Sequence, residues 1–304
     1  MVLSAIGLAL AFGCPAAGAG DGMPADPIPV TGILGVTFLS SDMGAVRQFY
    51  GHGAGFAALS DTPQGIRFAV GRSQFLEFIA VPSLEGRRRL QYVTLGATDL
   101  GKLQSVLEAR GVGVHAVDMP GAPNQLQFAD PGGNQIRAEQ VPEAENPIAG
   151  GSAAFSDHLQ HMGFAVDLVK ANASIAFYRD TLGLPEVVRM DGTDGRLGLV
   201  KFRLPGPGRE LIELIFHDSP LNKWAAGAFD HVNFEVTDIN ATYRALHGTG
   251  VATLPKHRPT VNGEHLWAIN LSDPELTRVE IQVLTATTVP VDTVSEDMTG
   301  SNRH

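Results

Sequence analysis

The sequence predicts an α+β protein built from four βαβββ units, in which each pair of units forms a domain with a concave mixed sheet covered by helices. Three observations predict this class: the chain repeats itself, each repeat opens with an alternating strand and a helical stretch, and the remainder reads as short strands. A length of 304 residues suits two domains, and 44% hydrophobic residues suffice for two cores.

The repeat is visible as matching motifs that lie about 128 positions apart. Phe49-Tyr50 corresponds to Phe177-Tyr178, and the first alignment pairs Ile33 with His161; both pairs differ by 128 positions (177 − 49 and 161 − 33). Later motifs show a larger shift, as loop insertions produce. The matched segments are 32–39 with 160–167, 75–78 with 211–214, 92–99 with 231–238, and Asp130-Pro131 with Asp273-Pro274.

Each unit is expected to begin with a strand that has one apolar face. In residues 161–167, Met162, Phe164 and Val166 share one face, and His161 lies on the other. Helices are predicted at 42–51, 99–110, 170–182 and 238–248, where they would cover the apolar faces. Strands are predicted at 66–70, 75–81, 198–204, 210–216, 265–271 and 278–284.

The repeat and the Pro/Gly-rich links give the domain boundaries. We expect a signal peptide at 1–19, a linker at 20–30, an N-terminal domain at 31–142, a linker at 143–157, a C-terminal domain at 158–286 and a flexible tail at 287–304. The apolar run 2–12 is too short to span a bilayer and fits the apolar region of a secretory signal. It therefore predicts a periplasmic or secreted protein. A lipid anchor at Cys14 and a cytosolic chain are the alternatives.

Charge and cysteine content exclude several classes of function. The net charge is −10 and no basic stripe is present, so nucleic acid is not an expected partner. The single Cys14 excludes an internal disulfide and a Cys-built zinc site, so any metal must be held by His, Asp or Glu. The expected partner is a small-molecule substrate, with no membrane span; the sequence leaves a homo-oligomer open.

Motifs in the second half resemble the vicinal-oxygen-chelate superfamily, the group of glyoxalase I, extradiol dioxygenases, methylmalonyl-CoA epimerase and bleomycin resistance proteins. The resemblance rests on Phe-Tyr-Arg-Asp-Thr-Leu-Gly-Leu (177–184), Leu-Ile-Glu-Leu (211–214) and Ser-Asp-Pro with Val-Glu-Ile (272–281). It covers about 31–285 and implies two tandem glyoxalase-like domains. It does not fix the reaction, because one fold hosts many chemistries.

The resemblance implies that His161, Glu213, His231 and Glu280 hold one divalent metal ion. Two imidazoles and two carboxylates suit Zn, Mn, Fe, Co or Ni. Strand alternation independently turns both histidines away from the helix-packed face. The corresponding residues of the first half are aligned as Ile33, Glu77, Tyr92 and Arg137, so that half is expected to be degenerate and to have a structural or shielding role.

The expected activity is that of a lyase or isomerase on a small oxygen-rich substrate, with Glu280 or Glu213 as the base and Glu280 slightly favoured. An extradiol-type dioxygenase and a small-molecule-sequestering binding protein are the alternatives. Asn270 stands where the dioxygenase motif has Tyr, whereas His265 fits the spacing of the upstream His in that motif. The candidate substrate-binding residues are Asn233, Glu235, His257, Arg258 and His265.

Overall fold

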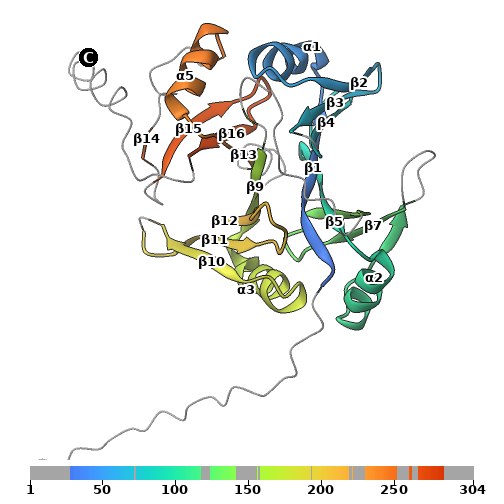
Figure 1. Ribbon diagram of the computed structural model, residues 1–304. Coiled ribbons are helices and arrows are strands. Elements are labelled where there is room, and N and C mark those ends of the chain that lie inside the picture. Colours follow the sequence, from blue (N-terminus) through green and yellow to red (C-terminus); the bar gives the residue numbers. More distant parts are fainter. Residues whose placement is uncertain are drawn as a thin grey trace, which may run out of the picture.

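The computed structural model describes residues 28–71, 73–117, 124–141, 156, 158–192, 194–218, 221, 230–251, 260–261 and 266–283. Within these residues the chain forms four βαβββ units in two eight-stranded mixed sheets, as predicted (Figure 1). The predicted signal peptide, the tail and most of both linkers lie outside the described residues. In the described part of the chain, no helix is long and apolar enough to cross a membrane.

The first sheet contains the strands of units one and two in the order β2-β3-β4-β1-β5-β8-β7-β6. Its central pair, β1 and β5, is antiparallel, and each of these strands also pairs in parallel with the last strand of its own unit. The strands are β1 (Val30–Ser40), β2 (Ala58–Thr62), β3 (Gly65–Val70), β4 (Gln74–Ala80), β5 (Leu90–Ala97), β6 (His115–Val117), β7 (Gln125–Ala129) and β8 (Gln135–Gln140).

The second sheet repeats this topology in the order β10-β11-β12-β9-β13-β16-β15-β14. Here β9 and β13 form the antiparallel central pair, and β12 and β16 flank them in parallel. The strands are β9 (His158–Asp167), β10 (Glu186–Asp191), β11 (Leu197–Arg203), β12 (Leu211–His217), β13 (His231–Glu235), β14 (Thr260–Val261), β15 (Trp267–Ser272) and β16 (Arg278–Gln282).

One helical segment per unit covers the apolar face of its sheet. They are α1 (Met43–Val46) continuing into η1 (Arg47–Gly53), α2 (Leu100–Ala109), η2 (Leu168–Lys170) with α3 (Ala171–Ala176) and η3 (Phe177–Thr181), and α5 (Ile239–Gly248). Asp99 and Asp238, the last residues of two repeat motifs, accept hydrogen bonds from Lys102 N and Ala241 N and cap α2 and α5. Phe164 stacks on Tyr178 of η3 at 6.5 Å, so the face opposite His161 is the helix-covered one.

The strand register corrects the alignment of Ile33 with His161. Gly35 pairs with Thr94 as His161 pairs with Asn233, and Ile33 pairs with Leu95 as Leu159 pairs with Phe234. The position equivalent to His161 is therefore Gly35, a shift of 126 positions (161 − 35). Ile33 corresponds to Leu159, and both side chains are completely buried in the core.

The two halves contact each other through reciprocal buried tyrosine–aspartate hydrogen bonds. Tyr50 of η1 donates its hydroxyl to Asp273, and Tyr178 of η3 donates to Asp130, both at 3.0 Å. The repeated Phe-Tyr and Asp-Pro motifs are thus the two sides of one type of contact. As a result, α1 lies beside α5 and α2 beside α3 (Figure 1).

Aromatic contacts extend the same arrangement into a continuous core. Phe56 of unit one packs on Phe234 of unit four at 5.4 Å, and Phe128 of unit two packs on Phe177 of unit three at 6.5 Å. Buried apolar residues from both halves form one cluster. Such burial is the main favourable contribution to folding.

Replacing Asp273 with Ala should destabilise the protein strongly. Its carboxylate also accepts two contacts from Arg89 Nη1 at 2.7 and 2.9 Å, and Arg89 is only 5% exposed. Among the described residues, the substitution leaves Arg89 with Glu275 as its remaining acidic partner, so we expect a loss of about 3 kcal/mol of unfolding free energy in urea titrations.

Asp61→Ala is the matched control for this prediction. Asp61 also pairs with an arginine, Arg47, but both side chains are about 40% exposed. Removing such an exposed pair should leave the urea midpoint nearly unchanged. Equal midpoint shifts for Asp273→Ala and Asp61→Ala would contradict the role assigned to the buried contact.

Candidate metal centre

Four adjacent strands at the middle of the second sheet each place one acidic or imidazole side chain on the face that the helices leave uncovered. The strands are β12, β9, β13 and β16, and they carry Glu213, His161, His231 and Glu280. Register arranges these residues in two neighbouring rows across the strands. Glu213, Gly163 and His231 form one row, and His161, Asn233 and Glu280 form the next.

Three of these side chains converge on one point. His161 Nε2 and His231 Nε2 lie 3.1 Å apart, and Glu213 Oε2 lies 3.0 Å from each of them. Metal–ligand bonds of about 2.0–2.2 Å place neighbouring donors of one ion about 3 Å apart. The donor types and their spacing therefore fit a divalent cation held by His161, His231 and Glu213.

Glu280 lies next to this group but slightly farther out. Its Oε2 atom is 3.6 Å from His161 Nε2 and 3.9 Å from His231 Nε2. Asn233 Nδ2 donates to Oε2 at 3.0 Å, and Arg278 donates to Oε1 at 2.8 Å. The carboxylate is thus held in place by two neighbours while one oxygen faces the imidazoles.

The proton on His161 is placed by its neighbour Gln160. Gln160 Oε1, an acceptor, lies 2.5 Å from His161 Nδ1, so Nδ1 carries the proton and Nε2 presents a lone pair to Glu213 and His231. Burial, aided by the charge of Lys201, lowers the pKa of His161 to about 4, so its imidazole is neutral at physiological pH. A neutral imidazole is the form that binds a metal.

Both carboxyl groups are ionised in the same pH range. Burial by itself would raise the pKa of Glu213, but attraction to His231, a hydrogen bond from the His231 imidazole and the charge of Lys201 hold it well below its usual value. Burial likewise opposes ionisation of Glu280, but Arg278 together with His231 and His161 outweighs burial and lowers the pKa of that carboxyl. Ionised carboxylates beside a neutral imidazole suit a cation.

Two supporting residues were not found from the sequence. A Cβ atom on Gly163 would lie 2.0 Å from His231 Cε1, so only glycine leaves room for the imidazole above β9. Lys201 pairs directly with Glu213 across β11 and β12, is buried, and places Nζ 3.9 Å from Glu213 Oε1. Both contacts depend on which residues of neighbouring strands lie opposite each other. The residue pattern of a single strand does not reveal this pairing.

The comparisons with known proteins agree with this geometry. The model of the Glyoxalase/Bleomycin resistance protein/Dioxygenase superfamily matches residues 158–281. An ethylmalonyl-CoA/methylmalonyl-CoA epimerase from Cereibacter sphaeroides is 32% identical over 111 residues, which are 35% of this chain and 81% of the epimerase. The chain belongs to this superfamily.

Solved structures of superfamily members show the same fold across both halves. A homoprotocatechuate 2,3-dioxygenase from Brevibacterium fuscum aligns with a TM-score of 0.66 at 15% identity, covering 86% of this chain and 73% of the dioxygenase. The enzyme of the same name from Arthrobacter globiformis aligns with a TM-score of 0.64 at 14% identity, covering 86% and 82% of the two chains. At such identities the likeness shows the fold alone.

The predicted substrate-binding residues have different outcomes. Asn233 lies between His161 and Glu280, within the site. Glu235 lies at the end of β13, where its Oε2 is 2.8 Å from His158 Nδ1. Three other predicted residues lie outside the described part of the chain: His257, Arg258 and His265.

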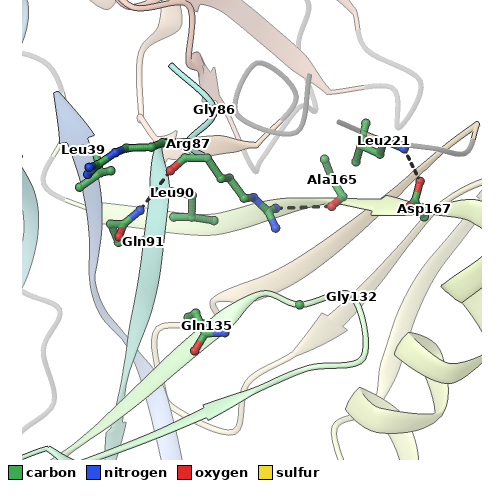
Figure 2. Close-up of a pocket in the computed structure, with 12 residues that line it drawn as sticks. Leu39, Gly86, Arg87, Leu90, Gln91, Gly132, Gln135, Ala165, Asp167 and Leu221 are labelled. Atoms are coloured by element: carbon green, nitrogen blue, oxygen red, sulfur yellow. Dashed lines mark hydrogen bonds between the residues drawn. The ribbon is translucent and has the colours of Figure 1, made fainter. Parts of the chain in front are cut away.

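A pocket of about 490 Å³ lies between the two halves (Figure 2). It is lined by the loop around Arg88, the turn at Gly132 and the end of β9 near Asp167. None of the four predicted ligands lines it. Arg88 is paired with Asp230, and Asp167 accepts a hydrogen bond from Leu221 N.

His158 makes the stability of the second half depend on pH. Burial lowers its pKa, but the nearby carboxylate of Glu210 and the hydrogen-bonded carboxylate of Glu235 outweigh burial and raise the pKa to about 9. Because the folded-state pKa exceeds the unfolded value of about 6.5, the protonated ring stabilises the fold below pH 6.5, and this stabilisation is lost as the pH rises through 9.

We therefore expect the unfolding free energy to fall by up to about 3 kcal/mol between pH 6.5 and 9.5. Urea denaturation across this range measures the slope. His158→Gln should flatten it, whereas His52→Gln, which alters an exposed histidine, should not. A slope unchanged in His158→Gln would contradict the assignment.

Proposed function

We propose that the protein is a divalent-metal-dependent isomerase or lyase that moves a proton at a carbon beside a carbonyl group. The observation that carries this proposal is the convergence of His161, His231 and Glu213 within about 3 Å of one another, with Glu280 held beside them. When bound, a divalent cation polarises a carbonyl oxygen of the substrate and so acidifies the neighbouring C–H bond.

The two carboxylates have different tasks in this proposal. Glu213 is equidistant from both imidazoles and completes the metal-binding set. Glu280 is farther out, ionised, and held by Asn233 and Arg278, so it is placed to accept the proton. Its burial excludes bulk water from the carboxylate, which preserves its orientation during proton transfer.

Charges around the site indicate the class of substrate. The two carboxylates are accompanied by the ammonium of Lys201 and the guanidinium of Arg278. A bound divalent cation would give this cluster an excess of positive charge, which stabilises negative charge on substrate oxygens. The epimerase relative is named for malonyl-type thioesters, and we propose a substrate with two such neighbouring carbonyl groups here.

An extradiol-type dioxygenase is the second candidate. Two histidines and one carboxylate, as in His161, His231 and Glu213, are also the ligand set of non-haem iron oxygenases. The fold neighbours are dioxygenases by name, although the identity of 15% supports only the fold. Glu280 favours proton transfer, because the set of two histidines and one carboxylate has no need of a second carboxylate. A protein that only sequesters a small molecule is the third candidate.

Metal analysis of the purified protein tests the site itself. We expect about one divalent ion per chain in the wild type and far less in His161→Ala and His231→Ala, because each loses one of three converging donors. Tyr92→Ala, the control at the position equivalent to His231 in the first sheet, should retain the ion. Equal metal content in all four proteins would contradict the assignment.

The roles of the carboxylates are tested by Glu280→Gln and Glu213→Gln. Glu280→Gln should keep the metal but slow deuterium exchange at C2 of a methylmalonyl thioester in D2O by about 10²–10⁴-fold, because the base is lost. Glu213→Gln should lose both metal and exchange. Metal-loaded wild-type protein that shows no exchange, but consumes oxygen with catechols after anaerobic Fe²⁺ loading, would establish the dioxygenase instead. Ligand binding that is insensitive to chelator would support sequestration.

A further inference from the structure

The helix-free face of each sheet is concave, and we call this concave surface the cup of the sheet. The cup of the first sheet is lined by charged side chains that the proposed metal chemistry does not use. A pocket of about 290 Å³ lies over its helix-free face, close to the lower end of small-molecule sites. Arg67 of β3, Glu77 of β4, Tyr92 of β5 and Arg137 of β8 line it, together with Gln125 of β7. Five strands thus contribute polar side chains to one concave surface.

Register shows that this pocket is the counterpart of the metal centre. Arg67 pairs with Glu77 as Lys201 pairs with Glu213. Arg137 pairs with Thr94 as Glu280 pairs with Asn233. The two guanidinium groups therefore project where the other cup has an ammonium and a carboxylate.

An aromatic ring fills the place of the missing histidine. Gly35 is the counterpart of His161, and a Cβ atom there would lie 2.5 Å from the ring of Phe75. Phe75 lies over β1 at this point, and the guanidinium of Arg67 stacks on it at 4.1 Å from the ring centre. The space of a metal ligand is thus used to support an arginine.

Both arginines are held in fixed orientations. The guanidinium of Arg137 lies 3.5 Å from the ring centre of Tyr92 and receives a further restraint from Gln127 at 3.2 Å. Arg67 Nε and Nη2 contact Glu77 Oε1 at 3.2 and 3.0 Å. Stacked, planar guanidinium groups lose little freedom on binding a ligand, so the site is preorganised.

Glu77 does not cancel the positive charge of the pocket. Arg67 contacts its Oε1, while Thr37 donates to Oε2 at 2.9 Å and Tyr92 OH lies 3.4 Å from Oε2. The residues that line the pocket thus include two guanidinium groups and one carboxylate. Glu139, farther along β8, accepts from Gln125 at 2.9 Å. The side chains of Arg67 and Glu77 are 39% and 22% exposed, so the pocket is open to solvent.

We propose that the cup of the first sheet binds a small carboxylate anion between Arg67 and Arg137. A planar carboxylate matches the donor fork of a guanidinium, and two forks in one pocket suit a dicarboxylate of three or four carbons. The ring of Tyr92 and the amide of Gln125 complete the walls. The proposal is independent of the metal centre, because none of its residues belongs to the second sheet.

Tyrosine NMR with malonate as the probe tests this site on the full chain. The protein has four tyrosines: Tyr50 and Tyr178 are buried at the contact between halves, and Tyr243 is on α5. With ¹³C-labelled tyrosine, malonate should shift the signal of Tyr92 in a saturable manner and leave the other three in place. Tyr92→Phe assigns the signal, and neutral malonamide at the same concentration should cause no shift.

Substitutions define the residues responsible. Arg137→Gln and Arg67→Gln should each weaken malonate binding at least about tenfold, because each removes one charged fork. Lys102→Gln removes the same charge from the exposed side of α2 and should leave the affinity unchanged. The signals of Tyr50 and Tyr178 report whether each variant is folded. A Tyr92 signal that malonate does not move, or moves equally in folded Arg137→Gln and Arg67→Gln, would overturn the proposal.

Discussion

The register of the antiparallel pair β9 and β13 is the constraint on which the candidate site depends. His231 faces Gly163 across this pair, and Asn233 faces His161. Because side chains alternate between faces, a slip of one residue would turn one strand over, so that its histidine would face the helices and its apolar residues would leave the core. Gly163 makes the correct register sterically acceptable, since any side chain there would collide with the imidazole. The spacing of about 3 Å among His161, His231 and Glu213 follows from this arrangement.

The register also explains which features of the fold and of the candidate site could be predicted from the sequence and which could not. Alternation along β9 was enough to place His161 opposite Met162 and Phe164, and the internal repeat was enough to predict four βαβββ units. The alignment of Ile33 with His161 was wrong, because His161 and Tyr178 are 17 positions apart whereas Gly35 and Tyr50 are 15 apart, and an ungapped comparison that carries the shift of the Phe-Tyr pair back to the strand does not detect these two extra residues. Lys201 and Arg278 were missed as partners of the carboxylates for a related reason: cross-strand neighbours lie far apart in the chain.

The two buried carboxylates of the candidate site require positive charge close to them. Glu213 and Glu280 are almost fully buried, and desolvation of an ionised carboxylate is costly unless cations or hydrogen-bond donors surround it. The ammonium of Lys201 lies near the outer oxygen of Glu213, and Arg278 donates to the outer oxygen of Glu280, whereas the inner oxygens face the nitrogen atoms of the histidines. Since Gln160 places the proton of His161 on Nδ1, its Nε2 lone pair points at a carboxylate oxygen. His161, His231 and Glu213 would hold a divalent cation between these atoms, and its positive charge would offset their repulsion.

The two sheets have the same strand order, but the side chains in their cups carry different charges. The contact between the halves explains why the charge of the cups can differ. Tyr50 and Tyr178 make the same hydrogen bond to Asp273 and Asp130, on the helix-covered side of each sheet. Folding and association of the halves therefore depend on that side and on the strand register. Side chains on the opposite face project into the cups, where neither the core nor the contact between halves constrains their charge. The position that His161 occupies in the second sheet can thus be taken by Gly35 in the first sheet, beneath Phe75, while the register of the surrounding strands is preserved.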